Sequence, residues 1–136
     1  MRILILNYEY PPLGGGAGVC SAYHAQGLAA LGHEVCVLTT GFPGYPETET
    51  HTNLVIRRLP ARRRFRHKSN PLEMYAWVRA SHRYLKMAGS PLPYDVVMAN
   101  FTLPGGLVAR RLQRRDGIPY MILSHGQDIP WFFPRQ

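Results

Sequence analysis

The sequence has few cysteines, few acidic residues and no long apolar segment. Only two of its 136 residues are cysteines, Cys20 and Cys36, and their spacing fits no zinc motif. The opening MRILIL is too short for the apolar core of a signal peptide, and no stretch approaches the roughly 18 apolar residues that a membrane-spanning helix needs. We therefore expect a cytoplasmic protein with reduced thiols, no disulfide framework and no membrane span.

The composition is that of one folded domain with excess positive charge. Hydrophobic residues make up 46% and aromatic residues 11%, which is enough to build a core and excludes a disordered or collagen-like chain. Sixteen Lys and Arg residues against eight Asp and Glu residues give a formal net charge of +8. This charge favours an anionic partner, which can be a phosphate, a lipid headgroup or a nucleic acid.

Short apolar segments alternate with helix-like segments along the chain. The predicted strands cover residues 2–7, 34–39, 54–59, 95–99 and 119–123. The predicted helices cover residues 17–31, 72–88 and 104–115, and residues 40–53 are predicted to form a loop. This order predicts an α/β fold with a doubly wound parallel sheet. The loops that follow its strands then share one edge, where ligands bind in such sheets.

The helix-like segments carry apolar stripes that predict their buried faces. The stripe of the first helix consists of Cys20, His24, Leu28 and Leu31. The stripe of the second consists of Met74, Trp77, Val78, Ser81 and Leu85, with Arg79, Arg83 and Lys86 on the opposite face. The anchors of the third are Leu107, Val108 and Leu112.

A glycine-rich loop, PPLGGGAG, follows the first predicted strand and opens the first helix. Backbone N–H groups at such a helix start can hold a phosphate or a carboxylate. A dinucleotide site is disfavoured, because Ser21 stands where the third glycine of that motif belongs and Thr39-Thr40-Gly41 stands where an acidic residue is needed. Two interpretations stay open: a tight turn, or a loop that faces an anion or a sugar.

A second polar loop, Ser124-His125-Gly126-Gln127-Asp128, follows the last predicted strand. An imidazole at that edge can donate or accept a hydrogen bond near neutral pH, and Asp128 can orient it or bind a hydroxyl. The alternative is that His125 caps a following helix. The other histidines share no spacing, so no metal site is expected.

Positive charge is concentrated between residues 57 and 86, where ten Lys and Arg residues accompany a single acidic residue, Glu73. Its densest part contains Arg62, Arg63, Arg64, Arg66 and Lys68. One interpretation is a solvated surface, and another is docking on an anionic membrane at its cytoplasmic face. Nucleic-acid binding is disfavoured, because no known binding motif accompanies the charge.

Four segments in this order resemble the N-terminal half of family 4 (group 1) glycosyltransferases, which have the GT-B fold. They are RILILNYEYPPLGGGAG, LAALGHEVCVLTTG, YDVVMAN with the following TLPGGLVARRL, and IPYMILSHGQD. The resemblance implies a Rossmann-like domain over residues 1–136. It also implies retaining transfer of a sugar from a nucleotide-sugar donor to a glycan or lipid-linked acceptor. Because the sequence shows no metal-type spacing, we expect neither a cofactor nor a metal.

The same resemblance implies roles for single residues. Gly15 and Gly16 match the glycine loop that approaches the donor phosphates and the acceptor, and His125 matches the histidine that binds the donor sugar beside the reacting carbon. Asp128 matches the acidic position of that loop.

The second domain of the family, with its basic pair and E-x7-E motif, has no counterpart in these residues, so we expect the chain alone to be inactive. Two alternatives remain: a non-catalytic half that needs a partner chain, or a phosphate- or nucleotide-binding Rossmann module of another class.

Overall fold

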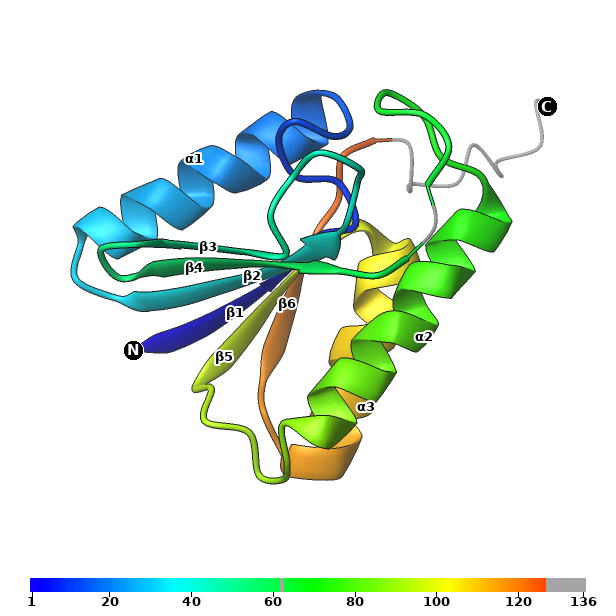
Figure 1. Ribbon diagram of the computed structural model, residues 1–136. Helices are drawn as coiled ribbons and strands as arrows, with labels where there is room; N and C mark the ends of the chain where they lie inside the picture. Colours follow the sequence, from blue (N-terminus) through cyan, green and yellow to red (C-terminus); the bar gives the residue numbers. More distant parts are fainter. Residues whose placement is uncertain (62, 127–136) are drawn as a thin grey trace, which may run out of the picture.

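The computed structural model describes residues 1–61 and 63–126, and it contains a sheet with helices on both faces (Figure 1). The strands are β1 (Arg2–Leu6), β2 (Glu34–Thr40), β3 (Thr48–His51), β4 (Leu54–Leu59), β5 (Val96–Asn100) and β6 (Tyr120–Leu123). The helices are α1 (Gly16–Ala30), α2 (Pro71–Met87) and α3 (Gly106–Asp116), and a short irregular turn, η1 (Phe101–Gly105), leads into α3.

The six strands lie in the order β3-β4-β2-β1-β5-β6, and all neighbours are parallel except β3 and β4. At the centre of the sheet β1 pairs with β2, so that Arg2 lies opposite Glu34 and Leu6 lies opposite Leu38. Helix α1 covers one face of the sheet, and α2 and α3 cover the other (Figure 1). The predicted α/β class and doubly wound sheet are therefore confirmed.

The prediction of a loop over residues 40–53 is wrong in its second half. Thr48–His51 forms the antiparallel edge strand β3, which pairs with β4 through a two-residue turn at Thr52 and Asn53. Asn53 adopts a φ of 58°, a left-handed conformation that asparagine tolerates better than most residues. Because β3 is polar on both faces, it lacks the apolar alternation that marks a strand.

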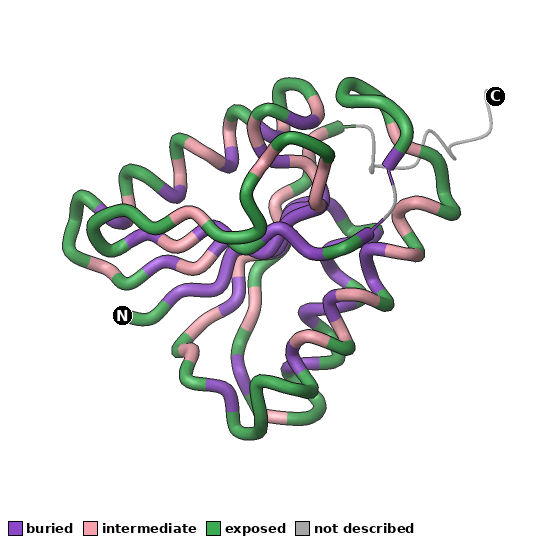
Figure 2. Tube along the Cα trace, viewed as in Figure 1, coloured by how far each residue is buried: buried purple, intermediate pink, exposed green. Residues whose placement is uncertain are grey.

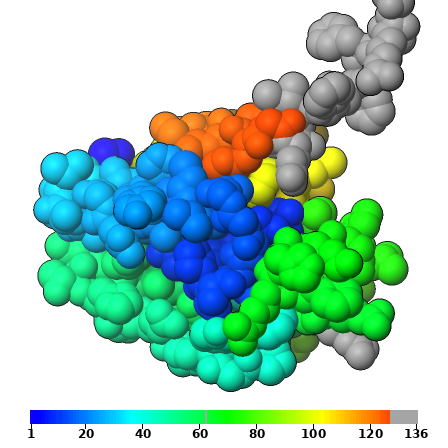
Figure 3. Space-filling model, turned by 90° about the horizontal axis from the view of Figure 1, so that it is seen from above, coloured from blue at the N-terminus to red at the C-terminus, as the bar shows by residue number. Residues whose placement is uncertain are grey.

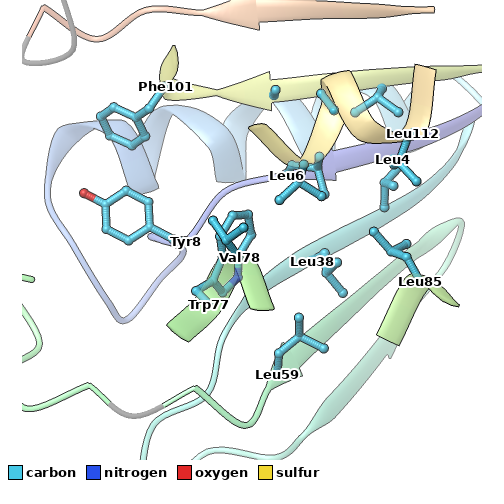
Figure 4. Close-up of a cluster of buried hydrophobic side chains, with 14 of the residues drawn as sticks. Leu4, Leu6, Tyr8, Leu38, Leu59, Trp77, Val78, Leu85, Phe101 and Leu112 are labelled. Carbon is cyan, nitrogen blue, oxygen red and sulfur yellow. The ribbon is translucent and has the colours of Figure 1, made fainter. Parts of the chain in front are cut away.

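The larger part of the core lies between the sheet and the helices α2 and α3 (Figure 4). Leu4 and Leu6 of β1 and Leu38 of β2 point into it, and Trp77 of α2 is fully buried there. Figure 2 shows buried residues along the central strands and exposed residues on the outer sides of the helices. The predicted stripe of α2 is confirmed: Trp77 and its stripe partners Val78, Ser81 and Leu85 are buried, and Met74 packs against them.

The smaller part of the core lies under α1, whose predicted buried face is wrong. The helix buries Gly18, Ser21, Ala25 and Ala29, whereas Leu31 is 76% exposed. Small side chains let the helix lie close to Ile3 and Ile5 of the sheet. The larger side chains of the predicted stripe therefore lie at the side of this contact and not in its centre. His24 is half-buried at that flank, with its Nδ1 3.9 Å from Cys20 Sγ.

In α3 the predicted anchors Val108 and Leu112 are buried, but the prediction for Leu107 is wrong, since 47% of it is exposed. A helix of eleven residues on one side of a sheet buries a single stripe, and Val108, Ala109 and Leu112 fill it.

Candidate functional site

The loops that follow β1, β5 and β6 meet at the carboxyl edge of the sheet. Because β1, β5 and β6 are parallel neighbours, their carboxyl ends lie side by side. Figure 3 looks onto this edge and shows the blue β1–α1 loop between the orange residues that follow β6 and the green segment that precedes α2. The loops singled out in the sequence therefore share one surface, as predicted.

In the glycine loop, a side chain would clash with neighbouring atoms at two of the glycines and would meet no atom at two others. Gly14 has a φ of 83°, and a Cβ there would collide with Glu9; a Cβ on Gly18 would lie 2.9 Å from Leu13 O. By contrast, a Cβ on Gly15 or Gly16 would meet nothing within 4 Å. Packing within the chain therefore does not explain glycine at positions 15 and 16, and open space remains beside them for a ligand.

The start of α1 carries N–H groups that no side chain caps. Gly15 is the N-cap residue, lacks a side chain, and no acidic residue lies in the first turn. Both Gly15 and Gly16 are exposed. The first N–H groups of a helix have no partner within the helix and carry partial positive charge, so this end of α1 suits a negatively charged group.

Two buried asparagines lie at the ends of the neighbouring strands β1 and β5. Asn7 donates from Nδ2 to Ala17 O at 3.3 Å and accepts from Glu9 N at 3.0 Å, which ties the glycine loop to the strand. Asn100 donates from Nδ2 to Leu6 O at 3.4 Å, and Ser21 Oγ lies 3.5 Å away. Both side chains are fully buried, so they hold the loops in fixed positions.

His125 is fixed against the end of β5. Its Nε2 lies 2.9 Å from Asn100 Oδ1, and its ring centroid lies 4.9 Å from that of Phe101. Since Asn100 Nδ2 donates to Leu6 O, the amide oxygen faces the imidazole, so Nε2 carries the proton and donates it to that oxygen. In the neutral ring, Nδ1 is then the acceptor.

Phe101 supports this arrangement at a conformational cost. Its φ is 67°, a left-handed value that is unfavourable for a bulky residue, and its ring is buried against Tyr8 at 5.3 Å between centroids. Strained backbone that packing holds in place tends to occur at functional sites. Here it turns the chain directly after Asn100 and sets the ring against His125.

Part of the basic segment is fastened to the glycine loop. Gly14 N donates to Arg66 O at 2.6 Å. Arg63 donates to Tyr8 O and to Glu9 Oε1, each at 3.3 Å, and its guanidinium lies 5.6 Å from the ring centroid of Tyr8. The prediction that Arg63 belongs to an exposed basic surface is therefore wrong, because only 1% of its side chain is exposed.

The other predicted residues fall into two groups. Arg64, Arg66 and Lys68 are exposed, as a surface segment requires. Arg62 and Asp128 lie outside the described residues. Within residues 1–61 and 63–126, no three His, Cys, Asp or Glu side chains gather as a metal site would need, and no helix there is long and apolar enough to cross a membrane.

Sequence reasoning missed the supporting residues of the site. It assigned no role to Asn7, Ser21 or Asn100, although two neighbouring apolar strands that both end in asparagine are a readable signal. The pairing of Leu6 with Ala99 places those two asparagines level with one another.

Comparison with known proteins agrees with this geometry. Residues 15–136 match the family described as "Glycosyl transferase 4-like domain". One structure of sucrose-phosphate synthase from Thermosynechococcus elongatus aligns over 94% of this chain and 65% of its own, with 19% identity and a TM-score of 0.68. Another structure of that synthase aligns over 91% and 32%, with 20% identity and a TM-score of 0.62.

The chain thus spans less than two-thirds of the length of either structure. None of the curated proteins with which the sequence was compared matches it. At this level of identity the two structures show the fold, which is the Rossmann-like N-terminal half of the GT-B architecture. With nine-tenths of its residues inside the family match, this chain belongs to the glycosyl transferase 4-like domain family.

Proposed function

We propose that residues 1–136 form the acceptor-side domain of an enzyme that moves a sugar from a nucleotide-sugar donor to a glycan or lipid-linked acceptor, with retention of configuration. A second domain would supply the nucleotide site and close the cleft. The observation that supports this most directly is His125, held by Asn100 beside the uncapped start of α1. A hydrogen-bonding ring and a set of free N–H groups are what a sugar and its departing phosphate need.

Each group has a role in this proposal. His125 contacts the donor sugar beside the carbon that reacts, and Asn100 acts as a positioning residue that fixes the ring. The N–H groups that follow Gly15 and Gly16 stabilise negative charge on the phosphate as the bond to the sugar breaks. Asp128 is proposed to bind a sugar hydroxyl in the same loop. No step in this scheme requires a metal ion, so transfer is expected to persist in EDTA.

The test is turnover of the full-length protein with His125→Ala. We expect a loss of ~10²-fold or more, as for the removal of one preorganised donor in other enzymes, with an unchanged melting temperature. His33→Ala is the matched control, because His33 lies before β2, at the opposite edge of the sheet. Near-normal turnover of His125→Ala would remove the assigned role.

Two further measurements separate this proposal from its alternatives. The anomeric configuration of the product, read by proton NMR, should match that of the donor; inversion would refute the retaining mechanism. The 136-residue chain alone should show no transfer, because its cleft has one wall. If transfer appears only after a separate chain is added, the second domain is supplied by a partner.

A second proposed property is docking of the exposed 64–68 segment on an anionic membrane. Arg64 and Lys68 flank the Phe65 ring, with their charged groups 5.1 and 4.7 Å from its centroid, and Phe65 is itself exposed. Cations around an exposed aromatic ring suit the interface of a charged bilayer.

Vesicle sedimentation tests this property. At low salt, the full-length protein should sediment with phosphatidylglycerol vesicles and not with phosphatidylcholine vesicles. The double variant Arg64→Gln/Lys68→Gln should bind several-fold less, and Arg110→Gln/Arg114→Gln on α3 is the charge-matched control. Equal binding to both kinds of vesicle would exclude electrostatic docking.

A further inference from the structure

A groove of about 620 Å³ lies between α2 and the residues at the end of β4. Leu59 and Pro60 line it on the side of the sheet, and Ala76, Ala80 and Tyr84 line it on the side of the helix. Because alanine side chains are small, they leave space between the helix and the chain that leaves β4. None of the described residues that line the groove belongs to the glycine loop or to the loop after β6.

Two arginines on this side of α2 have no carboxylate partner among the described residues. Arg79 and Arg83 both line the groove, and both are exposed. Within residues 1–61 and 63–126, neither forms an ion pair or a side-chain hydrogen bond, and no Asp or Glu lines the groove. Residues four positions apart are neighbours on a helix surface, so the two positive charges repel each other. An anion held between them would remove this repulsion.

Apolar side chains lie beside these charges. Met87, which also lines the groove, is 79% exposed, and Leu72 and Tyr75 on the outer side of α2 are 79% and 61% exposed. The only acidic residue of α2 is Glu73, whose carboxylate accepts hydrogen bonds at the start of the helix. A helix surface that combines cations with exposed apolar side chains is typical of contact with anionic lipid.

We infer that this groove binds one molecule of an anionic phospholipid, with its phosphate between Arg79 and Arg83 and an acyl chain against Met87. The two guanidinium groups offer N–H donors in a geometry that matches phosphate oxygens. The apolar wall of Leu59 and Pro60 covers part of the acyl chain that water would otherwise surround. A free phosphate would use the arginines but would gain nothing from this wall.

This site goes beyond the proposed docking of the 64–68 segment. That docking needs only positive charge at the surface of a bilayer, whereas the groove would recognise a single lipid by both its charge and its chain. The site also does not depend on sugar transfer, because the groove and the His125 loop have no described residue in common. Each of these properties can therefore be removed without the others.

The experiment is calorimetric titration of the full-length protein with short-chain lipids below their critical micelle concentration, so that only single lipid molecules are present. Dihexanoyl phosphatidylglycerol should bind. Dihexanoyl phosphatidylcholine, whose choline cancels the charge, and glycerol 3-phosphate, which lacks acyl chains, should bind more weakly. Arg79→Gln/Arg83→Gln should weaken the affinity for dihexanoyl phosphatidylglycerol ~10-fold. Met87→Gln, which keeps the size of the side chain but makes it polar, should weaken that affinity several-fold.

The matched control is Arg110→Gln/Arg114→Gln, because these arginines have the same spacing on α3, are exposed and do not line the groove. The control should leave the affinity for the lipid unchanged. Arg64→Gln/Lys68→Gln and His125→Ala should leave it unchanged as well. Failure of this site therefore gives a different result from failure of membrane docking or of the proposed sugar transfer.

Three results would overturn the inference. The first is that dihexanoyl phosphatidylglycerol does not bind. The second is that glycerol 3-phosphate binds as tightly as the lipid, which would make the groove a site for a free phosphate. The third is that the arginine variants of α2 and α3 lose equal affinity, which would make the net charge of the protein responsible.

Discussion

Single buried polar residues do most to shape the carboxyl edge. Asn7 and Asn100 each end an apolar strand, and each satisfies backbone groups of a neighbouring loop. A polar side chain with no exposure is tolerated only where its hydrogen bonds are made, so these residues specify loop positions as well as stabilise them. The hydrogen bond between His125 Nε2 and Asn100 Oδ1 fixes the orientation of the histidine ring.

Replacement of Asn100 by leucine tests this dependence. Asn100→Leu removes the acceptor of His125 Nε2, so the ring should lose its fixed orientation and turnover of the full-length protein should fall ~10²-fold. Because Nε2 donates to Asn100 Oδ1, we expect NMR spectra of the parent protein to show a protected ring proton on His125, and this signal should be lost in the variant while the melting temperature stays close to that of the parent. Unchanged turnover would show that His125 does not depend on Asn100.

Residues at strand ends were easier to predict than residues that pair across the fold. His125, Gly15 and Gly16 were placed at the carboxyl edge because each follows a strand, and parallel strands align their ends. Arg63 was misplaced because its partners, Tyr8 and Glu9, are more than fifty positions away in the sequence. Only the folded chain reveals that this guanidinium is neutralised and buried.

Among the elements, α2 shows the closest agreement between pattern and structure. Its long apolar stripe contains large side chains, which determine the face of the helix that is buried. At the start of the helix, Asn70 and Glu73 form a reciprocal capping box. Burial opposes ionisation of Glu73, but hydrogen bonds from Arg64 N, Asn70 N and Ser69 Oγ outweigh it and keep the pKa of this carboxyl below its ordinary value.

The elements that were mispredicted lack such a pattern. In α1 the contact with the sheet is made by small residues, which carry little hydrophobic signal, and β3 is polar throughout. Both depend on tertiary packing, which local periodicity does not encode.

Removal of the α2 cap should weaken the fold measurably. Asn70→Ala leaves Glu73 N without its side-chain acceptor and should lower the free energy of unfolding by ~1 kcal/mol. Tyr75→Ala, an exposed change in the same helix, should alter stability by less than ~0.5 kcal/mol. Urea denaturation of both variants measures the difference, and equal effects would contradict the role of the cap.

A histidine on α2 should make stability depend on pH. Burial, with a smaller contribution from the positive charge of Arg111, lowers the pKa of His82 below 6.5 in the folded chain. Protonation therefore favours the unfolded state. The contribution of His82 to stability should be fully present above about pH 6.5, the ordinary pKa of histidine, and it should fall as the pH drops through the lowered pKa.

His82→Gln should flatten the dependence of stability on pH below about pH 6.5, the ordinary pKa of histidine. The measurement is the urea midpoint at several pH values. An unchanged slope would show that His82 is not the group responsible.

For the whole molecule, the two edge strands of the sheet differ in polarity. The β3 edge is polar, whereas β6 exposes Met121 and Ile122 and, among the described residues, no strand pairs with its outer side. Exposed apolar edge strands promote association between chains. The doubly wound sheet and its shared carboxyl edge followed from the alternation of strands and helices, but whether each edge strand is polar or apolar on its outer side could not be predicted from the sequence.

The isolated 136-residue chain should consequently self-associate through β6. Met121→Lys, which places a charge on this strand, should lower the light scattering of a concentrated solution. Leu31→Lys is the matched control, because Leu31 is also exposed but lies beyond the end of α1. If both variants reduce scattering equally, net charge and not the strand edge is responsible.

The attachment of the 63–66 segment to the glycine loop has a consequence for protein engineering. Arg63 is held by three main-chain oxygens and by Glu9, so residues 8–14 and 63–66 fit each other as a matched pair. A chimera that borrows only one of these pieces from a relative would leave a buried charge or carboxylate without its counterpart. An exchange of the carboxyl-edge loops between relatives should therefore move both segments together, so that each buried charge keeps its partner.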